Sequence, residues 1–126
     1  MPTLEVTIQV KQDGVPVAGF PLTRRVQVDE LQSFAVEIPT HGSLSDGNVI
    51  PLNYQDTVQA LILTTDQTLT VGLKGGIPSQ GFGCPVVNAG GVLCIIGGDL
   101  GSGAVSNIVN NLSGSVANIR GIGGGT

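Results

Sequence analysis

Apolar and polar residues alternate with a period of two over much of the chain. The clearest example runs from Leu4 to Val10, where every second position is apolar, and the alternation returns from Phe34 to Ile38 and from Leu69 to Leu73. A period of two predicts a strand with one face buried and the other in water. From Thr57 to Leu63 the run is almost continuously apolar, which predicts a strand buried on both faces.

Turn residues separate these segments at short intervals. Gln12 to Gly14 predicts a turn, and the segment from Val15 to Val28 is extended but broken by a glycine and a proline, which is typical of an edge strand or a bend between sheets. Long loops are expected at 40–48 and, rich in glycine, at 75–83. Further short strands are expected at 49–53, 85–87, 92–96, 105–109 and 116–119.

These elements predict an all-β fold with a single domain over residues 1–126. About eight or nine short strands, separated by frequent turns and without an amphipathic helix, are typical of a β-sandwich or a jelly roll, and we favour the sandwich. The segment 102–111 is rich in β-branched residues and flanked by glycines, which favours a strand over a helix. The glycine-rich tail from Gly121 to Thr126 is expected to be frayed and flexible.

Composition argues against several classes of function. The chain has 20 glycines, 11% charged residues and a formal net charge of −4, and its five basic residues are scattered. We therefore expect no nucleic-acid partner. Three phenylalanines, one tyrosine and no tryptophan leave few stacking platforms for single strands or sugars. No apolar run is long enough for a membrane helix and no secretory signal is recognised, so we expect no membrane association and synthesis inside a cell.

No constellation of side chains for catalysis stands out. His41 is the single histidine, and no serine or cysteine lies in a nucleophile motif. The glycines at 97–103 lack the lysine of a phosphate-binding loop. Asp46, Asn48 and Asp56 could supply oxygen ligands to calcium, but no dense Asp-x-Asp pattern is present and turn formation is the preferred interpretation. We therefore expect a protein that is not an enzyme, with no catalytic residues, no metal site and no cofactor.

The two cysteines leave two interpretations open. Cys84 and Cys94 lie on either side of a turn predicted at 88–91, and if that turn closes a hairpin they could face each other and form a disulfide in an oxidising setting. In the preferred interpretation both are reduced and act as small hydrophobic residues beside Val86, Val92 and Ile95.

Three segments resemble small structural proteins of tailed-bacteriophage virions. They are 61–73 (LILTTDQTLTVGL), 90–98 (GGVLCIIGG) and 110–120 (NNLSGSVANIR). The resemblance covers most of the chain in style and rests on no diagnostic motif. The group includes capsid decoration, or cement, proteins with β-sandwich or jelly-roll folds. The resemblance implies a homo-oligomer, such as a trimer, that binds the major capsid protein or another virion protein on the outer capsid surface after synthesis in the host cytoplasm.

The implied mechanism is stabilisation of the mature shell by binding. A protein that binds the mature lattice better than its precursor shifts the equilibrium towards the mature state by mass action. The candidate contact residues are Met1, Pro2, Thr3, His41, Gly42, Ser43, Gly76, Ile77, Pro78 and Phe82. Two alternatives remain open: a tail, baseplate or fibre adaptor of a phage, and a ligand-binding β-sandwich module.

Overall fold

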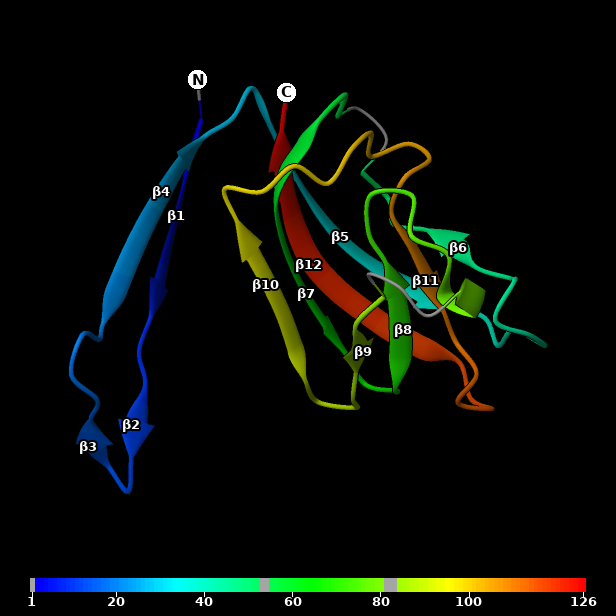
Figure 1. Ribbon diagram of the computed structural model, residues 1–126, viewed down its shortest axis with the longest axis horizontal. Coiled ribbons are helices and arrows are strands. Elements are labelled where there is room, and N and C mark those ends of the chain that lie inside the picture. Colours follow the sequence, from blue (N-terminus) through cyan, green and yellow to red (C-terminus); the bar gives the residue numbers. More distant parts are fainter. Residues whose placement is uncertain (1, 53–54, 81–83) are drawn as a thin grey trace.

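The structure is a computed structural model that describes residues 2–52, 55–80 and 84–126 (Figure 1). The described residues form twelve strands and one turn of 3-10 helix, which confirms the all-β prediction. Among them no helix is both long and apolar enough to cross a membrane. The elements are β1 (Thr3–Ile8), β2 (Lys11–Gln12), β3 (Val15–Pro16), β4 (Leu22–Gln27), β5 (Glu30–Ile38), β6 (Asn48–Val49), β7 (Val58–Thr65), β8 (Leu69–Gly72), η1 (Pro78–Gln80), β9 (Val86–Val87), β10 (Val92–Ile96), β11 (Ile108–Asn110) and β12 (Ala117–Gly125).

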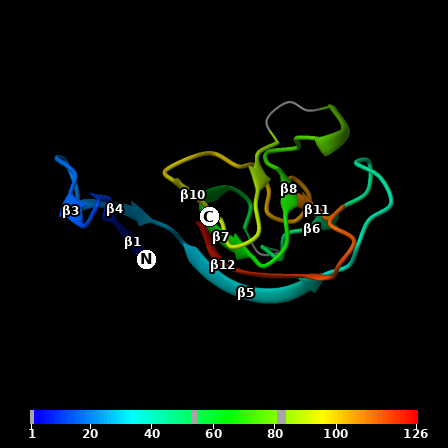
Figure 2. The ribbon, with the colours of Figure 1, turned by 90° about the horizontal axis from the view of Figure 1, so that it is seen from below.

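Two antiparallel four-stranded sheets pack against each other as a β-sandwich. The long sheet has the strand order β10-β7-β12-β5, and the short sheet has the order β6-β11-β8-β9. Figure 2 shows the long sheet curving around the short one. The core lies between them and includes Phe34, Ile38, Leu61, Leu63 and Ile119 from the long sheet and Leu69, Val71, Val87 and Val109 from the short sheet. The sandwich prediction is therefore supported, while the jelly-roll variant stays a prediction.

The C-terminal residues correct the expectation of a frayed tail. Gly121 to Gly125 form the second half of β12, which pairs with β5 on one side and β7 on the other. Thr126 continues this pairing, because its backbone exchanges hydrogen bonds with Thr57. The glycines are required by close packing: a Cβ at Gly121 would overlap the carbonyl oxygen of Ile62 and lie 2.7 Å from the ring of Phe34. The tail is thus a central strand.

The structure decides the open question of a hairpin at 88–91 and corrects the strand predicted at 105–109. The turn at 88–91 does not close a hairpin, because it carries the chain from β9 in the short sheet to β10 in the long sheet. The strand predicted at 105–109 begins only at Ile108, since Val105 lies in a turn and is 73% exposed.

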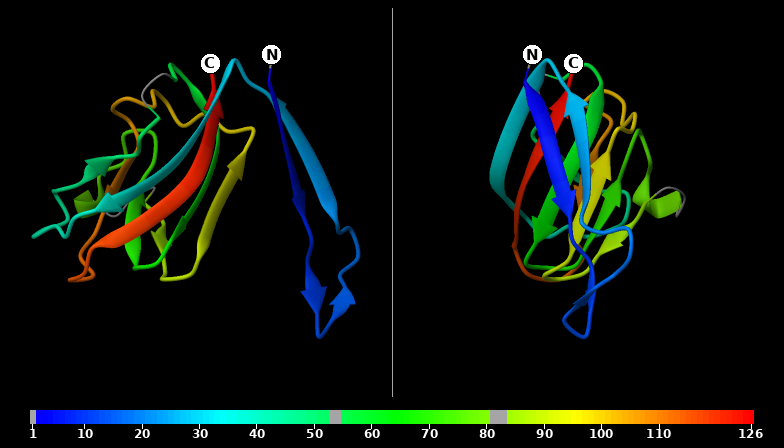
Figure 3. Two further views of the ribbon diagram at one scale, coloured as in Figure 1. Left: turned by 180° about the vertical axis from the view of Figure 1, so that it is seen from behind. Right: turned by 90° about the vertical axis from the view of Figure 1, so that its left-hand side faces the viewer.

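The first four strands form a hairpin arm that stands apart from the sandwich (Figures 1 and 3). Here β1 pairs only with β4, and β2 pairs only with β3. The tip is a two-residue turn at Asp13 and Gly14, both with positive φ, which matches the Asp-Gly preference of tight hairpins and confirms the predicted turn. The arm joins the sandwich through Val28 and Asp29, directly before β5.

Gly121→Ala tests the role of the C-terminal strand. The added methyl group must displace the backbone of β7 or the ring of Phe34, so we expect the free energy of unfolding to fall by about 1–3 kcal/mol in chemical denaturation. The matched control is Gly42→Ala, because a Cβ at Gly42 meets nothing within 4 Å; its effect should stay within about 0.5 kcal/mol. Equal effects of the two substitutions would contradict the assignment.

Candidate functional site

The hairpin arm has one apolar face and one polar face. The register of β1 and β4 places Leu4 opposite Val26 and Ile8 opposite Leu22, with Val6 between them. The polar face carries the hydroxyl pair of Thr7 and Thr23, whose oxygens lie 3.0 Å apart, and the ion pair of Arg25 and Glu5 at 2.6 Å. The alternation that predicted a half-buried strand from Leu4 is thus present in the structure.

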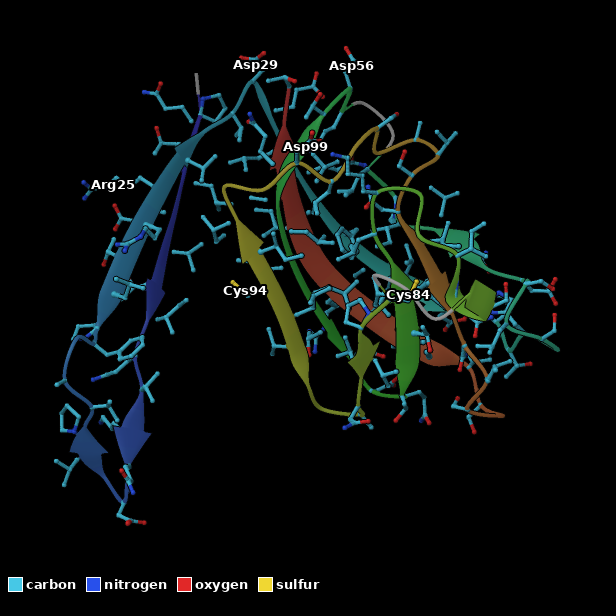
Figure 4. All side chains as sticks on the ribbon, viewed as in Figure 1. Arg25, Asp29, Asp56, Cys84, Cys94 and Asp99 are labelled. Atoms are coloured by element: carbon cyan, nitrogen blue, oxygen red, sulfur yellow. The ribbon has the colours of Figure 1, made fainter. Side chains whose placement is uncertain are left out.

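Within the described chain that apolar face is only partly covered: Leu4 at the base is buried, and exposure increases towards the tip. Ile8 is 39% exposed, and Val15 near the tip is 65% exposed. Figure 4 shows Arg25 pointing away from the sandwich, so the apolar face is on the side of the arm that is turned towards the sandwich. An isolated two-stranded hairpin is marginally stable in water at best. The arm therefore requires another surface to cover its apolar face.

The base of the arm is fixed to the sandwich. Val28 is completely buried, and its side chain lies over Gly124 in the outer face of the long sheet. Its N–H donates to the carbonyl oxygen of Pro2, and the N–H of Asp29 donates to that of Gly125 at 2.9 Å. Pro2 and Thr3, two of the predicted contact residues, lie at this base. Met1 lies outside the described residues.

The outer face of the long sheet is also apolar and uncovered. Leu61 and Leu63 point into the core, so the alternate positions of β7 face outward, and the strand register aligns them with outward positions of β10 and β12. Val92 on this face is 64% exposed. An antiparallel sheet with one face in water normally carries polar residues there. We define the outer apolar face by Ile62, Val92, Cys94, Ile96 and Ile122, whereas Ala60 on the same side of β7 is completely buried.

The remaining predicted contact residues lie at the end of the sandwich opposite the arm (Figures 1 and 3). His41, Gly42 and Ser43 belong to the loop between β5 and β6, while Gly76, Ile77 and Pro78 lead from β8 into η1. The structure thus places these two groups at one end and Pro2 and Thr3 at the base of the arm. Phe82 lies outside the described residues.

His41 has a structural role in its loop. Its Nδ1 accepts the N–H of Asn111 at 2.8 Å, so the ring proton is on Nε2, which donates to Oδ1 of Asn48 at 2.6 Å. The N–H of His41 donates in turn to the carbonyl oxygen of Asn111 at 2.7 Å. The side chain therefore links the loop after β5 to the segment after β11.

Two surface carboxylates are stabilised in their charged form. The pKa of Asp66 is lowered because its oxygens accept the side-chain NH2 of Asn118 at 2.8 Å and the backbone N–H of Asn118 at 2.7 Å. The pKa of Asp99 is lowered by the N–H of Gly101 and by Lys74, which lies 3.1 Å away. Asp66 fastens the turn after β7 to β12, at one end of the outer apolar face.

The cysteines do not form the disulfide that a hairpin would have allowed. Figure 4 places Cys94 on β10 and Cys84 beside the short sheet, and the two are not bonded to each other. The reason is the turn at 88–91, which passes between the sheets.

Among the described residues no three His, Cys, Asp or Glu side chains gather as a metal site, and Asn48, one of the calcium candidates, bonds to His41.

Comparison of the chain with protein-family models, with curated proteins and with solved structures gives no match in any of the three.

Two apolar faces that the described chain covers only in part, one on the arm and one on the outer side of the long sheet, were not predicted from the sequence. For the outer apolar face a signal was present in the sequence. The apolar run from Thr57 to Leu63 predicts a strand buried on both faces, and the second sheet of a sandwich covers only one of them. That the arm stands apart from the sandwich could not be predicted, because strands that pack against a core show the same alternation of apolar and polar residues.

His41→Ala tests the loop connection. The change removes both ring bonds and leaves the N–H of Asn111, a fully buried residue, without its acceptor. We expect the free energy of unfolding to fall by about 1–3 kcal/mol. The control is Thr40→Ala at the exposed neighbouring position, which should change it by less than about 0.5 kcal/mol. A His41→Ala protein as stable as the control would refute the role.

Asp66→Asn tests the charge at the end of the outer apolar face. Because the pKa of Asp66 is lowered from 3.8 in the folded protein, its charge stabilises the fold above pH 3.8, and this contribution is lost as the pH falls through the lowered value. In urea unfolding the wild type should therefore be more stable than the variant near neutral pH, with a difference that shrinks below pH 3.8. A difference that is independent of pH would contradict the assignment.

Proposed function

We propose that the protein is a structural component of a tailed-bacteriophage virion, which binds the outer surface of the capsid and stabilises the mature shell. The proposal combines the resemblance of segments 61–73, 90–98 and 110–120 to virion proteins with one structural observation. That observation is the arm, whose apolar face is only partly covered by the described chain. Such a face is typical of a protein that completes its structure in an assembly.

Two loops at the end of the sandwich opposite the arm support this role, because they are exposed and could contact the capsid. The loop that carries His41 is exposed at Gly42 and Ser43, and the segment before η1 is exposed at Ile77, which is 43% accessible. The bonds of His41 hold the first of these loops in one conformation, so little ordering is required when it binds. We propose these two loops as the surface that contacts the capsid lattice.

Stabilisation of the shell then follows from mass action. A protein that binds the mature lattice and not the precursor lowers the free energy of the mature state in proportion to RT times the logarithm of its concentration over its dissociation constant. The binding requires no catalytic step. Several copies that are joined in a homo-oligomer would bind more tightly than one, because each bound copy raises the effective concentration of the next.

The test is the location of the protein in particles of the phage that encodes it. We expect the chain in the capsid fraction after heads and tails are separated, and purified protein should co-sediment with expanded shells but not with precursor shells. A chain found in the tail fraction would instead support the tail or baseplate adaptor. Absence from both fractions, with no binding to expanded shells, would refute a virion role.

A double substitution in the loops separates capsid binding from folding. Gly42→Asp with Ile77→Asp places charges on two exposed positions of the proposed contact surface. We expect co-sedimentation with expanded shells to weaken at least about tenfold, with unfolding free energy unchanged within about 1 kcal/mol. The matched control is Ala89→Asp on the exposed turn between β9 and β10, which should bind like the wild type.

A further inference from the structure

We propose that the arm of one copy packs its apolar face on the outer apolar face of the long sheet of a second copy. This inference does not depend on the virion role. It rests on two surfaces of the same chain: the arm face of Leu4, Val6, Ile8, Leu22 and Val26, and the outer apolar face that includes Ile62, Cys94 and Ile122. Each is a surface of paired strands, and two such surfaces pack face to face about 10 Å apart.

The arm is kept from covering its own sheet by its base. Only Val28 and Asp29 separate β4 from β5, and the backbone of both is fixed by hydrogen bonds to Pro2 and Gly125. The side chain of Val28 fills the space between the start of the arm and the sheet at Gly124. The base therefore directs the arm away from the sandwich. Its apolar face is then available to a neighbouring molecule.

The charges of the two parts are complementary, which favours a second copy as the occupant. The described arm, residues 2–27, has three basic side chains (Lys11, Arg24 and Arg25) against two acidic ones (Glu5 and Asp13), a net charge of +1. The rest of the chain has two basic and seven acidic side chains, a net charge of −5, and the two parts together give the −4 of the whole chain. Arm-to-sandwich contact between copies is thus electrostatically favoured, whereas sandwich-to-sandwich contact is opposed.

One pair of residues carries this complementarity into the proposed interface. Arg24 lies opposite Val6 on the apolar face of the arm, donates to the carbonyl oxygen of Thr23 at 3.0 Å and forms no ion pair within the described residues. Glu37 lies opposite Asn118 at the border of the outer apolar face and also forms no ion pair there. Arg120 also lies on this outer face, opposite Ala35 and Thr64, so the docked arm is expected to direct Arg24 towards Glu37 and away from Arg120.

The contact joins unlike surfaces, so the assembly is closed only where the rotation between copies closes, and is an open filament otherwise. Two copies can exchange arms reciprocally about a two-fold axis, or each arm can reach the next copy around a ring. Either arrangement covers both apolar faces of every copy.

The first experiment measures oligomeric mass by light scattering over about a hundredfold range of concentration. We expect an oligomer for the wild type. Ile8→Glu, which puts a carboxylate into the arm face, should raise the dissociation constant roughly 100-fold or more and give monomers. The matched control, Thr7→Glu, changes the neighbouring residue on the polar face and should retain the oligomer. A monomeric wild type, or an oligomer that resists Ile8→Glu, would overturn the proposal.

The second experiment is complementation between the two faces. Cys94→Glu places a carboxylate on the exposed outer face and should also give monomers. Mixing it with the Ile8→Glu protein should restore heterodimers, because the intact arm of the first variant meets the intact sheet of the second. Circular dichroism of each variant shows whether it is folded. Folded monomers that fail to associate on mixing would overturn the proposal, since contacts between like faces cannot be repaired in this way.

Discussion

The pairing of β12 with both β5 and β7 is the constraint on which the rest of the sandwich depends. Ile119 is completely buried in this strand, and the glycines that follow it allow Leu52, Phe34 and the carbonyl oxygen of Ile62 to approach the backbone closely. β5, whose Phe34 and Ile38 lie in the core, is joined to the rest of the long sheet only through β12. The C-terminal segment therefore closes the fold, and the long sheet cannot form before the chain is complete to this strand.

Much of the β structure follows from local patterns, because strands and tight turns are encoded by neighbouring residues. The alternation at Phe34 to Ile38 and the Asp-Gly turn at the tip of the arm both appear in the structure as predicted. The C-terminal glycines were misinterpreted for a physical reason. Glycine is typical of mobile chain in isolation, and its use for close packing depends on neighbours such as Ile62 and Phe34 that lie far away in sequence.

The candidate site was less predictable than the fold, because it depends on which surfaces remain exposed after the chain has folded. The contact residues at 41–43 and 76–78 were predicted from loop composition alone, but their position together at the end opposite the arm requires the three-dimensional arrangement. Likewise, the pattern of Leu4 to Ile8 specifies an apolar face and says nothing about what covers it. The arm and β7 each have an apolar face that the sandwich does not cover fully. Both faces would be buried, as their sequence patterns predict, if a further protein surface packed on them.

The stability of the hairpin conformation of the arm depends on whether another surface covers its apolar face. Fixing the backbone of each residue costs about 1–2 kcal/mol, and a two-stranded hairpin recovers this mainly through burial of its apolar face. Removing that face from water contributes roughly 25 cal/mol per Å2, a gain that Ile8 and Val15 realise only when another surface covers them. The sandwich has its own core and does not share this dependence. Arm order should therefore follow protein concentration through mass action, while the stability of the sandwich core depends on it much less.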